Sequence, residues 1–282
     1  DENVAVGNGA LTTNTTANDN TAFGTNALRL NTTGAGNTAV GKSALDANTN
    51  GTQNVAVGYN SLDANTTASY NTAMGHAALS ACTTGAGNTA VGQISQDDVT
   101  TGAQNTAIGA GSGHALTTGS ANTSLGYLAN SNNTTGNHNI SLGYNANPST
   151  TTVSAECTLG DANITNLRCN DTSISALSDS RDKTDVIDSP YGLDFINTVR
   201  PVQFKWETRD GNGKDGTTRV GFLAQELLAS CDGNNAVLDL VMDNNPEKLE
   251  AKYGNLVPIM AQAIKELSAK NDALEARLTT LE

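Results

Sequence analysis

One exact repeat governs the first half of this chain. Nine times an Asn is followed four residues later by a Gly, and each copy starts at the seventeenth position after the last, without an insertion. A repeat kept to the residue indicates one structural unit stacked on the next. The first half is therefore expected to be a rod rather than a globule with a pocket. The nine positions are Asn3, Asn20, Asn37, Asn54, Asn71, Asn88, Asn105, Asn122 and Asn139.

Each repeat contains the signals of a small coil. The consensus Asn-Thr-Ala-Val-Gly alternates polar and apolar residues as a strand does, and its Gly suits a turn with positive φ. An Ala-Leu pair offers a second inward position, and Thr-Thr-Gly offers a second strand and turn. We expect a β-solenoid or β-roll with two short strands per coil, a rod of roughly 40 Å at about 4.8 Å per coil. Stacked Asn side chains are expected to form hydrogen-bonded ladders.

The apolar content of each coil is low, with about one Val-sized residue, one Leu and two Ala. A single chain is therefore expected to be marginally stable, and association with copies of itself is the simplest remedy. After the fifth copy the Leu position becomes Gln96, Gly113, Asn130 and Asn147, and we expect the coil to narrow there. The repeats resemble the head repeats of trimeric adhesins and the repeats common in bacteriophage tail fibres.

Composition excludes several classes of function. The formal net charge of −13 disfavours binding to nucleic acid and to anionic lipid. No apolar run is long enough to span a bilayer, so no membrane insertion is expected, and no signal peptide is visible. Because the chain begins at an Asp already in phase with the repeat, we expect an N-terminal part to be missing. The four cysteines lack metal-site spacing, so we expect reduced, mostly buried thiols and neither a metal nor a cofactor.

The character of the sequence changes after Pro148. We divide the chain into nine β-repeats over 1–147, a β-strand connector over 148–177 and a small α+β domain over 178–282. Three segments of the connector read as short strands, Cys157–Gly160, Asn163–Arg168 and Thr172–Leu177. In the last domain we expect a short helix over 191–196, a strand over 199–206 and a strand passing into a helix over 219–226.

The end of the chain carries a heptad pattern, and we expect a coiled coil over 256–282. Apolar residues alternate spacings of three and four, and Asn271 falls at an a position, where a polar residue fixes register. A trimer of identical chains is favoured over a helix packed only on its own domain. This heptad seam consists of Val257, Met260, Ile264, Leu267, Asn271, Leu274, Leu278 and Leu281.

A series of motifs in the last domain makes a resemblance specific. In order they are Ser178-Asp-x-Arg-x-Lys183, Leu193 with Ile196, Pro201-Val-x-Phe-x-Trp206, Gly221-Phe-x-Ala-Gln-Glu226, Leu256-Val-Pro and Ala263-Ile-Lys-Glu-Leu267. This order resembles the C-terminal intramolecular chaperone domain of phage tailspikes and tail fibres, the endosialidase-type chaperone or peptidase S74 family. The resemblance implies a homotrimer that templates the folding of the fibre ahead of it and then cuts itself off.

The resemblance also implies a catalytic dyad of Ser178 and Lys183. A Lys whose pKa is lowered by burial can take the hydroxyl proton of a Ser that attacks a main-chain carbonyl, and the ester is then hydrolysed. No His lies in residues 151–282, so a Ser–His–Asp triad within this half is excluded. Attack on the Leu177 carbonyl gives a five-membered ring, attack on the Ser178 carbonyl gives a strained four-membered ring, and attack on a neighbouring chain avoids both.

Alternatives to this site remain open at this point. Ser180 is a rival nucleophile with a different spacing from the family motif. Ser178 and Asp179 are alternatively a simple turn cap, with Lys183 solvated. Arg181 and Asp182 are interpreted as positioning residues or surface charges.

We therefore expect a phage tail fibre segment, located in the virion and assembled in the host cytoplasm. Its partners would be two further copies, an upstream virion attachment region and a host cell-surface receptor, with glycans among the candidates. The rival hypotheses are a non-enzymatic fibre with an uncut chaperone domain, a bacterial trimeric adhesin passenger and a glycan-degrading tailspike. Nothing in residues 1–150 offers paired acidic residues at a fixed phase, which disfavours the last.

Overall fold

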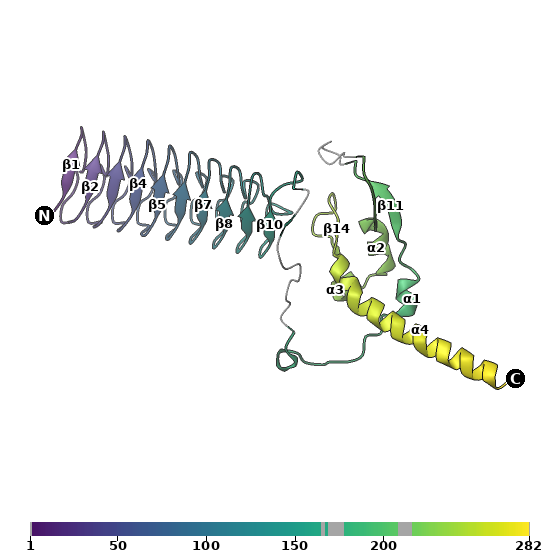
Figure 1. Cartoon of the computed structure of the whole chain (residues 1–282). Coiled ribbons are helices and arrows are strands. Elements are labelled where there is room, and N and C mark those ends of the chain that lie inside the picture. The colour runs from purple at the N-terminus through teal and green to yellow at the C-terminus, as the bar shows by residue number, and fades with distance from the viewer. Residues whose placement is uncertain (1, 165–166, 169–177, 208–215, 282) are drawn as a thin grey trace. The chain divides into compact units, whose positions relative to one another are not determined.

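The computed structural model describes residues 2–164, 167–168, 178–207 and 216–281. The chain divides into two compact units, residues 1–164 and 165–282, each described here by itself. The first unit is a β-solenoid and the second is a small α+β domain that ends in a long helix (Figure 1). The fold class expected from the sequence is thereby confirmed.

Over its described residues, the solenoid is one parallel sheet of ten strands in sequence order, three residues each. Every strand pairs with the next at a shift of one full repeat, as Ala39 with Ala56 and Ala56 with Ala73. The tenth strand pairs in the same register, so the segment expected to be a connector begins with a further coil. The strands are β1 Val4–Val6, β2 Thr21–Phe23, β3 Thr38–Val40, β4 Val55–Val57, β5 Thr72–Met74, β6 Thr89–Val91, β7 Thr106–Ile108, β8 Thr123–Leu125, β9 Ile140–Leu142 and β10 Cys157–Leu159.

The repeated Asn side chains hold each coil to the next. The backbone N–H of Asn54 donates to Oδ1 of Asn37 at 2.9 Å, and that of Asn71 donates to Oδ1 of Asn54 at the same distance. The Nδ2 of Asn54 donates 14 positions ahead, to the Ala68 carbonyl that ends its own coil. We call the nine repeated residues, from Asn3 to Asn139, the Asn ladder. The ladder is confirmed. The bonds that recur in every coil join side chain to backbone, and amide-to-amide bonds are added at some steps, as from Asn54 Nδ2 to Asn37 Oδ1 at 3.1 Å.

The glycine four residues after each ladder Asn is required twice over. Gly41 has φ +132°, a conformation that side chains disfavour. A Cβ built on Gly41 would also lie 2.5 Å from the Gly58 carbonyl oxygen of the next coil. The turn with positive φ expected after each strand is therefore present, and close stacking of coils adds a second constraint.

Each coil has one strand rather than the expected two. The Thr-Thr-Gly segments do bond from coil to coil, as Thr32 N–H does to the Thr49 carbonyl at 2.9 Å, but through turns and bends. The middle strand residues of the inner coils are buried within a single chain, Ala39 and Ala56 completely. The interior is therefore closed within one chain, because polar side chains fill the space that the few apolar residues leave. The association with copies expected from the low apolar content stays a prediction.

A second column of buried amides supplies much of that filling. Asn48 Nδ2 donates to Asn31 Oδ1 at 2.8 Å, and Asn65 Nδ2 donates to Asn48 Oδ1 at 2.7 Å. The column stops where Cys82 takes the next equivalent position, and Asn65 Oδ1 is left without a partner. We call Asn31, Asn48 and Asn65 the second Asn column. Its spacing of 17 residues shows in the sequence, but the bonds between these side chains appear only in the structure.

The loss of Leu after the fifth repeat does not interrupt the stack. Strand length and register continue unchanged from β6 to β10. Val99 and Leu116, at the phase of the second Asn column, are fully buried there. The Leu position itself is left-handed, with φ of 50–54° in the first five coils. Gly113 and Asn130 suit that backbone better than Leu does. In these later coils the buried apolar residue lies three positions after the Leu position, as Leu116 does after Gly113.

The second unit packs short elements on one end of a long helix. Residues of three short helices and of a two-stranded ladder share a core with the start of the long helix. Two further strands form a separate antiparallel pair. The helix, the strand and the strand-to-helix passage expected from the sequence are confirmed. The elements are η1 Ser180–Asp182, α1 Leu193–Ile196, β11 Val202–Lys205, β12 Thr218–Gly221, α2 Ala224–Ser230, α3 Asn235–Leu238, β13 Val241–Met242, β14 Glu250–Ala251, η2 Tyr253–Asn255 and α4 Leu256–Thr279.

The helix α4 has two apolar faces. Leu256, Ile259 and Ala263 are buried, the first two in the core of the unit. The apolar members of the heptad seam lie on another face and are 49–84% exposed. The domain therefore uses one face of the helix and leaves the heptad seam uncovered.

Breaking the second Asn column in its middle should destabilise the rod more than shortening it. Asn48→Val leaves Asn31 Oδ1 without a partner while Asn65 Oδ1 remains without one, so two buried amide oxygens of the column are unpaired. Asn65→Val removes the unpaired Asn65 Oδ1 and leaves only Asn48 Oδ1 unpaired. We expect Asn48→Val to cost about 1–3 kcal/mol more than Asn65→Val. Thermal and denaturant unfolding of the two variants measures this difference, and equal stabilities would contradict the role of the column.

The stability of the rod should depend on pH through Asp63, whose ionised carboxylate is unfavourable in the folded state. Burial, and then the charge of Asp46 in the adjacent coil, raises the pKa of Asp63. A raised folded-state pKa means that stability is present below the unfolded value and is lost as pH rises through the folded value. Asp63→Asn should therefore raise Tm by roughly 1–2 °C above pH 6 and leave it unchanged near pH 3. Glu2→Gln, at an exposed position, is the matched control.

Candidate functional site

The Ser178–Lys183 segment forms one tight turn at the start of the second unit. The turn η1 spans Ser180–Asp182, and Asp179 caps it by accepting from the Arg181 backbone N–H at 2.9 Å. The Lys183 N–H closes the turn on the Ser180 carbonyl at 3.3 Å. The turn lies within the six residues 178–183 and allows the first and last side chains to meet.

The two residues expected to form the dyad are in contact. Lys183 Nζ donates to Ser178 Oγ at 2.7 Å. This is the distance over which a neutral amine would accept the hydroxyl proton in the reverse sense. The turn-cap interpretation is also met, since Asp179 caps η1, but Lys183 is not simply solvated. Ser180 takes part in the turn through its backbone.

The site lies in the open on this chain. Every residue from 178 to 190 is exposed, so the burial expected around Lys183 is absent here. Leu177, whose carbonyl is one candidate for attack, lies outside the described residues. Any desolvation of the lysine must therefore come from outside the turn.

Asp179 and Arg181 form a bidentate ion pair beside the dyad. Arg181 Nη2 donates to Asp179 Oδ2 at 2.6 Å, and its Nε donates to Oδ1 at 3.0 Å. The side-chain bond from Arg181 is the main cause that lowers the pKa of Asp179. The same bond raises the pKa of Arg181. Both residues therefore stay charged at neutral pH.

Two further acidic residues of the resemblance motifs join separate elements of the unit. Glu226 of α2 pairs with Arg200, which lowers the pKa of the carboxyl. Glu266 of α4 accepts from the Leu193 backbone N–H at the start of α1, at 2.8 Å, and this bond lowers its pKa as well. A Cβ on Gly192 would lie 2.3 Å from Glu266 Oε1, so a larger residue there would have to displace the carboxylate from this bond. The motifs can be found in the sequence, but the partners of Glu226 and Glu266 appear only in the structure.

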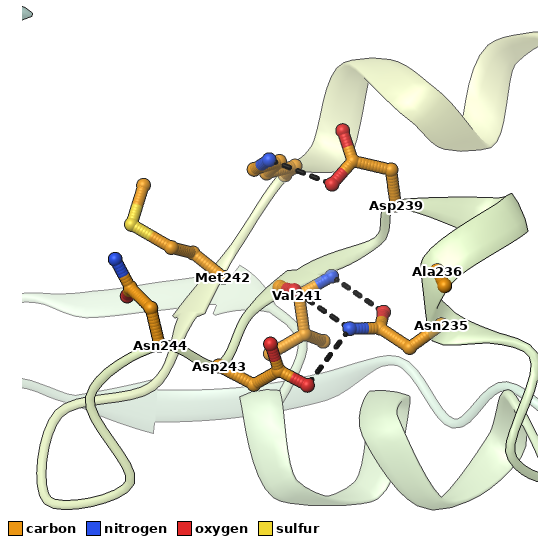
Figure 2. Close-up of a pocket in the computed structure, with 8 residues that line it drawn as sticks. Asn235, Ala236, Asp239, Val241, Met242, Asp243 and Asn244 are labelled. Atoms are coloured by element: carbon orange, nitrogen blue, oxygen red, sulfur yellow. Dashed lines mark hydrogen bonds and ion pairs between the residues drawn. The ribbon is translucent and has the colours of Figure 1, made fainter. Parts of the chain in front are cut away.

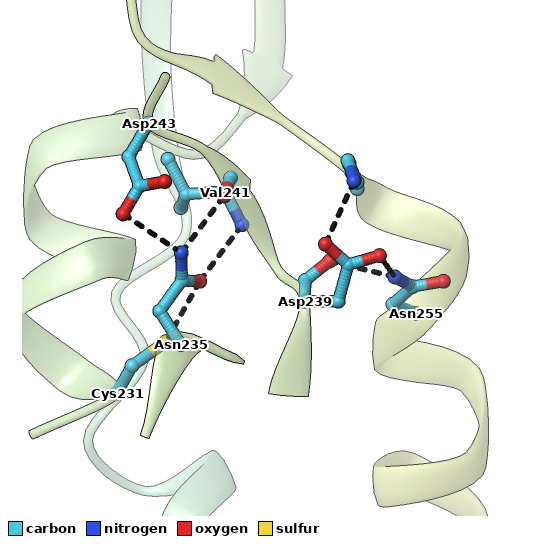
Figure 3. Close-up of polar contacts among 7 residues, drawn as sticks. Cys231, Asn235, Asp239, Val241, Asp243 and Asn255 are labelled. Atoms are coloured by element: carbon cyan, nitrogen blue, oxygen red, sulfur yellow. Dashed lines mark hydrogen bonds and ion pairs between the residues drawn. The ribbon is translucent and has the colours of Figure 1, made fainter. Parts of the chain in front are cut away.

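A shallow pocket lies in the same unit, away from the dyad residues in sequence (Figure 2). Its polar groups bind each other. Asn235 Nδ2 donates to the Val241 carbonyl at 2.9 Å and to Asp243 at 3.2 Å, while Asp239 accepts from Lys252 at 2.7 Å. Asn255 Nδ2 also donates to the Asp239 carbonyl, at 2.6 Å (Figure 3). These bonds join α3, β13 and the start of α4, which is a structural role.

The described residues hold no group of three or more His, Cys, Asp or Glu arranged for a metal ion. Within the same ranges, no helix is both long enough and apolar enough to cross a membrane. Cys82 and Cys231 are buried free thiols, Cys157 is exposed, and Cys169 lies outside the described residues. Burial raises the pKa of Cys82 to about 11, so this thiol is unreactive at neutral pH.

Comparison with known proteins gives a match to a protein-family model. Residues 178–237 match the family described as the chaperone of endosialidase, Peptidase_S74. No curated protein and no solved structure matches the chain. The family match begins at Ser178, the first residue of the turn, and covers the hairpin, α2 and part of α3. Residues 178–237, which follow the β-solenoid in sequence, are thus similar to the chaperone-of-endosialidase family.

Proposed function

We propose that this chain is one third of a homotrimeric fibre whose C-terminal domain aligns three copies and then releases itself by cutting at Ser178. The observation that carries the proposal is the Ser178–Lys183 contact at 2.7 Å, located where the family match begins. Two uncovered apolar surfaces, one in each unit, support the trimer.

The first of these surfaces is the heptad seam of α4. Its apolar residues are about half exposed or more, although a neighbouring face of the helix is packed in the domain core. Leu at successive heptad positions in water favours association with another helix of the same pattern. Asn271, in the middle of the seam, would set three chains in one register.

The second surface runs along the solenoid. The third residue of every strand is apolar and points outward, and six of the ten are 42–56% exposed. A continuous apolar row of this length is unusual on an isolated soluble protein. We call it the apolar stripe: Val6, Phe23, Val40, Val57, Met74, Val91, Ile108, Leu125, Leu142 and Leu159. Two further copies, carrying the same stripe at the same coil spacing, are the partners that match it throughout.

A folding template is useful to such a rod. The strands of adjacent coils pair one full repeat apart, and each coil has the same sequence phase as its neighbours, so a slip by one whole coil is a competing state. Three chains joined by a coiled coil begin folding in step and at high local concentration. Removal of the template afterwards leaves the rod kinetically trapped.

The proposed reaction uses the two side chains in contact. Neutral Lys183 takes the proton of Ser178 Oγ as that oxygen attacks a main-chain carbonyl carbon. The C–N bond breaks, the proton passes from the lysine to the departing amine, and an ester remains on Ser178. Water then cleaves the ester, which leaves a carboxylate and restores the hydroxyl. A contacting copy would supply the desolvation that the exposed turn lacks.

The architecture also supports a proposal for the wider setting of the chain. A rod released from a disposable folding domain fits a phage tail fibre that is assembled in the host cytoplasm, joined upstream to the virion and directed at a host cell-surface receptor. The second candidate is the same fibre with an uncut domain. The exposure of the whole 178–190 segment favours that alternative in a single chain.

Cleavage should depend on both members of the dyad. The expressed wild type should separate on a denaturing gel into two pieces that meet at about residue 178, while Ser178→Ala and Lys183→Ala should remain intact. Mass spectrometry of the pieces identifies the bond that is cut. Ser180→Ala is the matched control and should be cleaved normally. Cleavage that persists in both dyad variants would overturn the proposed activity.

Trimerisation should depend on the heptad seam. In a Ser178→Ala background, which keeps the chain whole, Leu267→Glu should convert trimers to monomers, because it places three charges at one core layer. Ala269→Glu adds the same charge at an exposed position outside the seam and should leave the trimer intact. Light scattering after size-exclusion chromatography measures the mass. A trimer that survives Leu267→Glu would contradict the coiled coil.

A further inference from the structure

The turn that joins the dyad residues is built by the side chain between them. Asp179 has extended backbone, φ −66° and ψ 132°, and its Oδ1 accepts from the Arg181 N–H. The Asp179 carbonyl accepts from the Asp182 N–H at 3.2 Å. All residues of the turn are exposed, and the bonds that hold it are polar. Among them, the Asp179 cap is the side-chain bond that fixes the start of η1.

The Arg181 side chain is held by charge alone. It is 87% exposed, and its three side-chain bonds all go to the Asp179 carboxylate. A residue so exposed contributes little to packing. Its evident effect is to occupy both oxygens of the carboxylate that stands next to the nucleophile.

Lys183 lies in an acidic segment. Residues 178–190 contain Asp179, Asp182, Asp185 and Asp188 against Arg181 and Lys183 as the only cations, and the whole stretch is exposed. Unpaired carboxylates near a lysine stabilise its charged form. A lysine that must act as a base needs the opposite.

We propose that Asp179 and Arg181 are positioning residues of the dyad: Asp179 shapes the turn that brings Lys183 to Ser178, and Arg181 keeps the Asp179 carboxylate from pairing with Lys183. This inference rests on the proposed self-cleavage. Asp179 acts through the backbone cap, which an amide can also make. Arg181 acts only through the charge of Asp179, so its effect should vanish when that charge is removed.

The direction of the effect can be worked out. Without Arg181, the free carboxylate of Asp179 favours protonated Lys183, and a smaller fraction of the lysine is neutral at a given pH. The rising limb of the cleavage rate against pH then moves to higher pH, by about half a unit or more for one carboxylate near an exposed lysine. The rate at high pH, where the lysine is neutral in either case, changes little.

The experiment follows cleavage of the full chain as it refolds. Unfolded chains recovered from inclusion bodies are diluted into buffers from pH 6 to 10, and cleavage is timed on denaturing gels. Native gels of the same samples report trimer formation, so that slow folding is not mistaken for slow cleavage. The variants are Arg181→Ala, Asp179→Asn, Asp179→Ala and the double variant Arg181→Ala with Asp179→Asn.

We expect Arg181→Ala to move the rising limb to higher pH and the double variant to restore it. Asp179→Asn keeps the cap and should cleave nearly as the wild type, whereas Asp179→Ala should lower the rate about fivefold at every pH. A limb that stays in place in Arg181→Ala, or a shift that the double variant does not reverse, would overturn the charge role. Equal rates for Asp179→Asn and Asp179→Ala would overturn the cap role.

Failure of this inference is distinguishable from failure of the proposed function. If Ser178→Ala and Lys183→Ala abolish cleavage but Arg181→Ala shows no shift, the dyad stands and only the positioning roles fall. If the dyad variants are cleaved as the wild type is, or the trimer is never cleaved, the proposed activity falls and these roles fall with it.

Discussion

The rod depends on one side chain that performs two tasks in every coil. Each inner ladder Asn accepts from the backbone of the next ladder Asn through Oδ1 and donates to the end of its own coil through Nδ2. One insertion would move an Asn out of reach of both partners and leave buried amide groups unpaired, which is costly. This constraint explains why the 17-residue period of the repeat contains no insertion.

Because amides and small residues fill the interior, the apolar residues of the strands are free to face outward. Ala39 and Ala56 are fully buried, while the Phe23 and Met74 side chains one strand position later are exposed. The solenoid thus closes within one chain and still presents the apolar stripe. Helix α4 divides its residues in the same way, with one face in the domain core and the heptad seam outside. Both units therefore satisfy their own interiors and leave an apolar surface exposed, which the proposed trimer would cover.

The proposed catalytic turn follows a different logic from the rod. It is local, exposed and held by polar contacts over six residues, whereas the rod is held by bonds between positions 14 and 17 apart in the sequence. A local turn can form in a single chain before assembly. Its exposure means that Lys183 stays in water until another surface covers it, which would delay the cut until the copies have come together.

The repeat unit, the stacking of coils, the glycine turns and several elements of the last domain could be predicted from the sequence, because spacing expresses these directly. The pair Ser178 and Lys183 was implied by the resemblance of the motif order to a known family. Only the structure shows that each coil has one strand and that amides help to close the interior within one chain. Only the structure also shows that Val99 and Leu116, three residues after the earlier Leu position, fill the interior of the later coils. It also decided that Asp179 pairs with Arg181 and that Glu266 reaches the start of α1. Spacing fixes which residues recur, but the side a residue faces and the partner it binds depend on backbone geometry between distant segments.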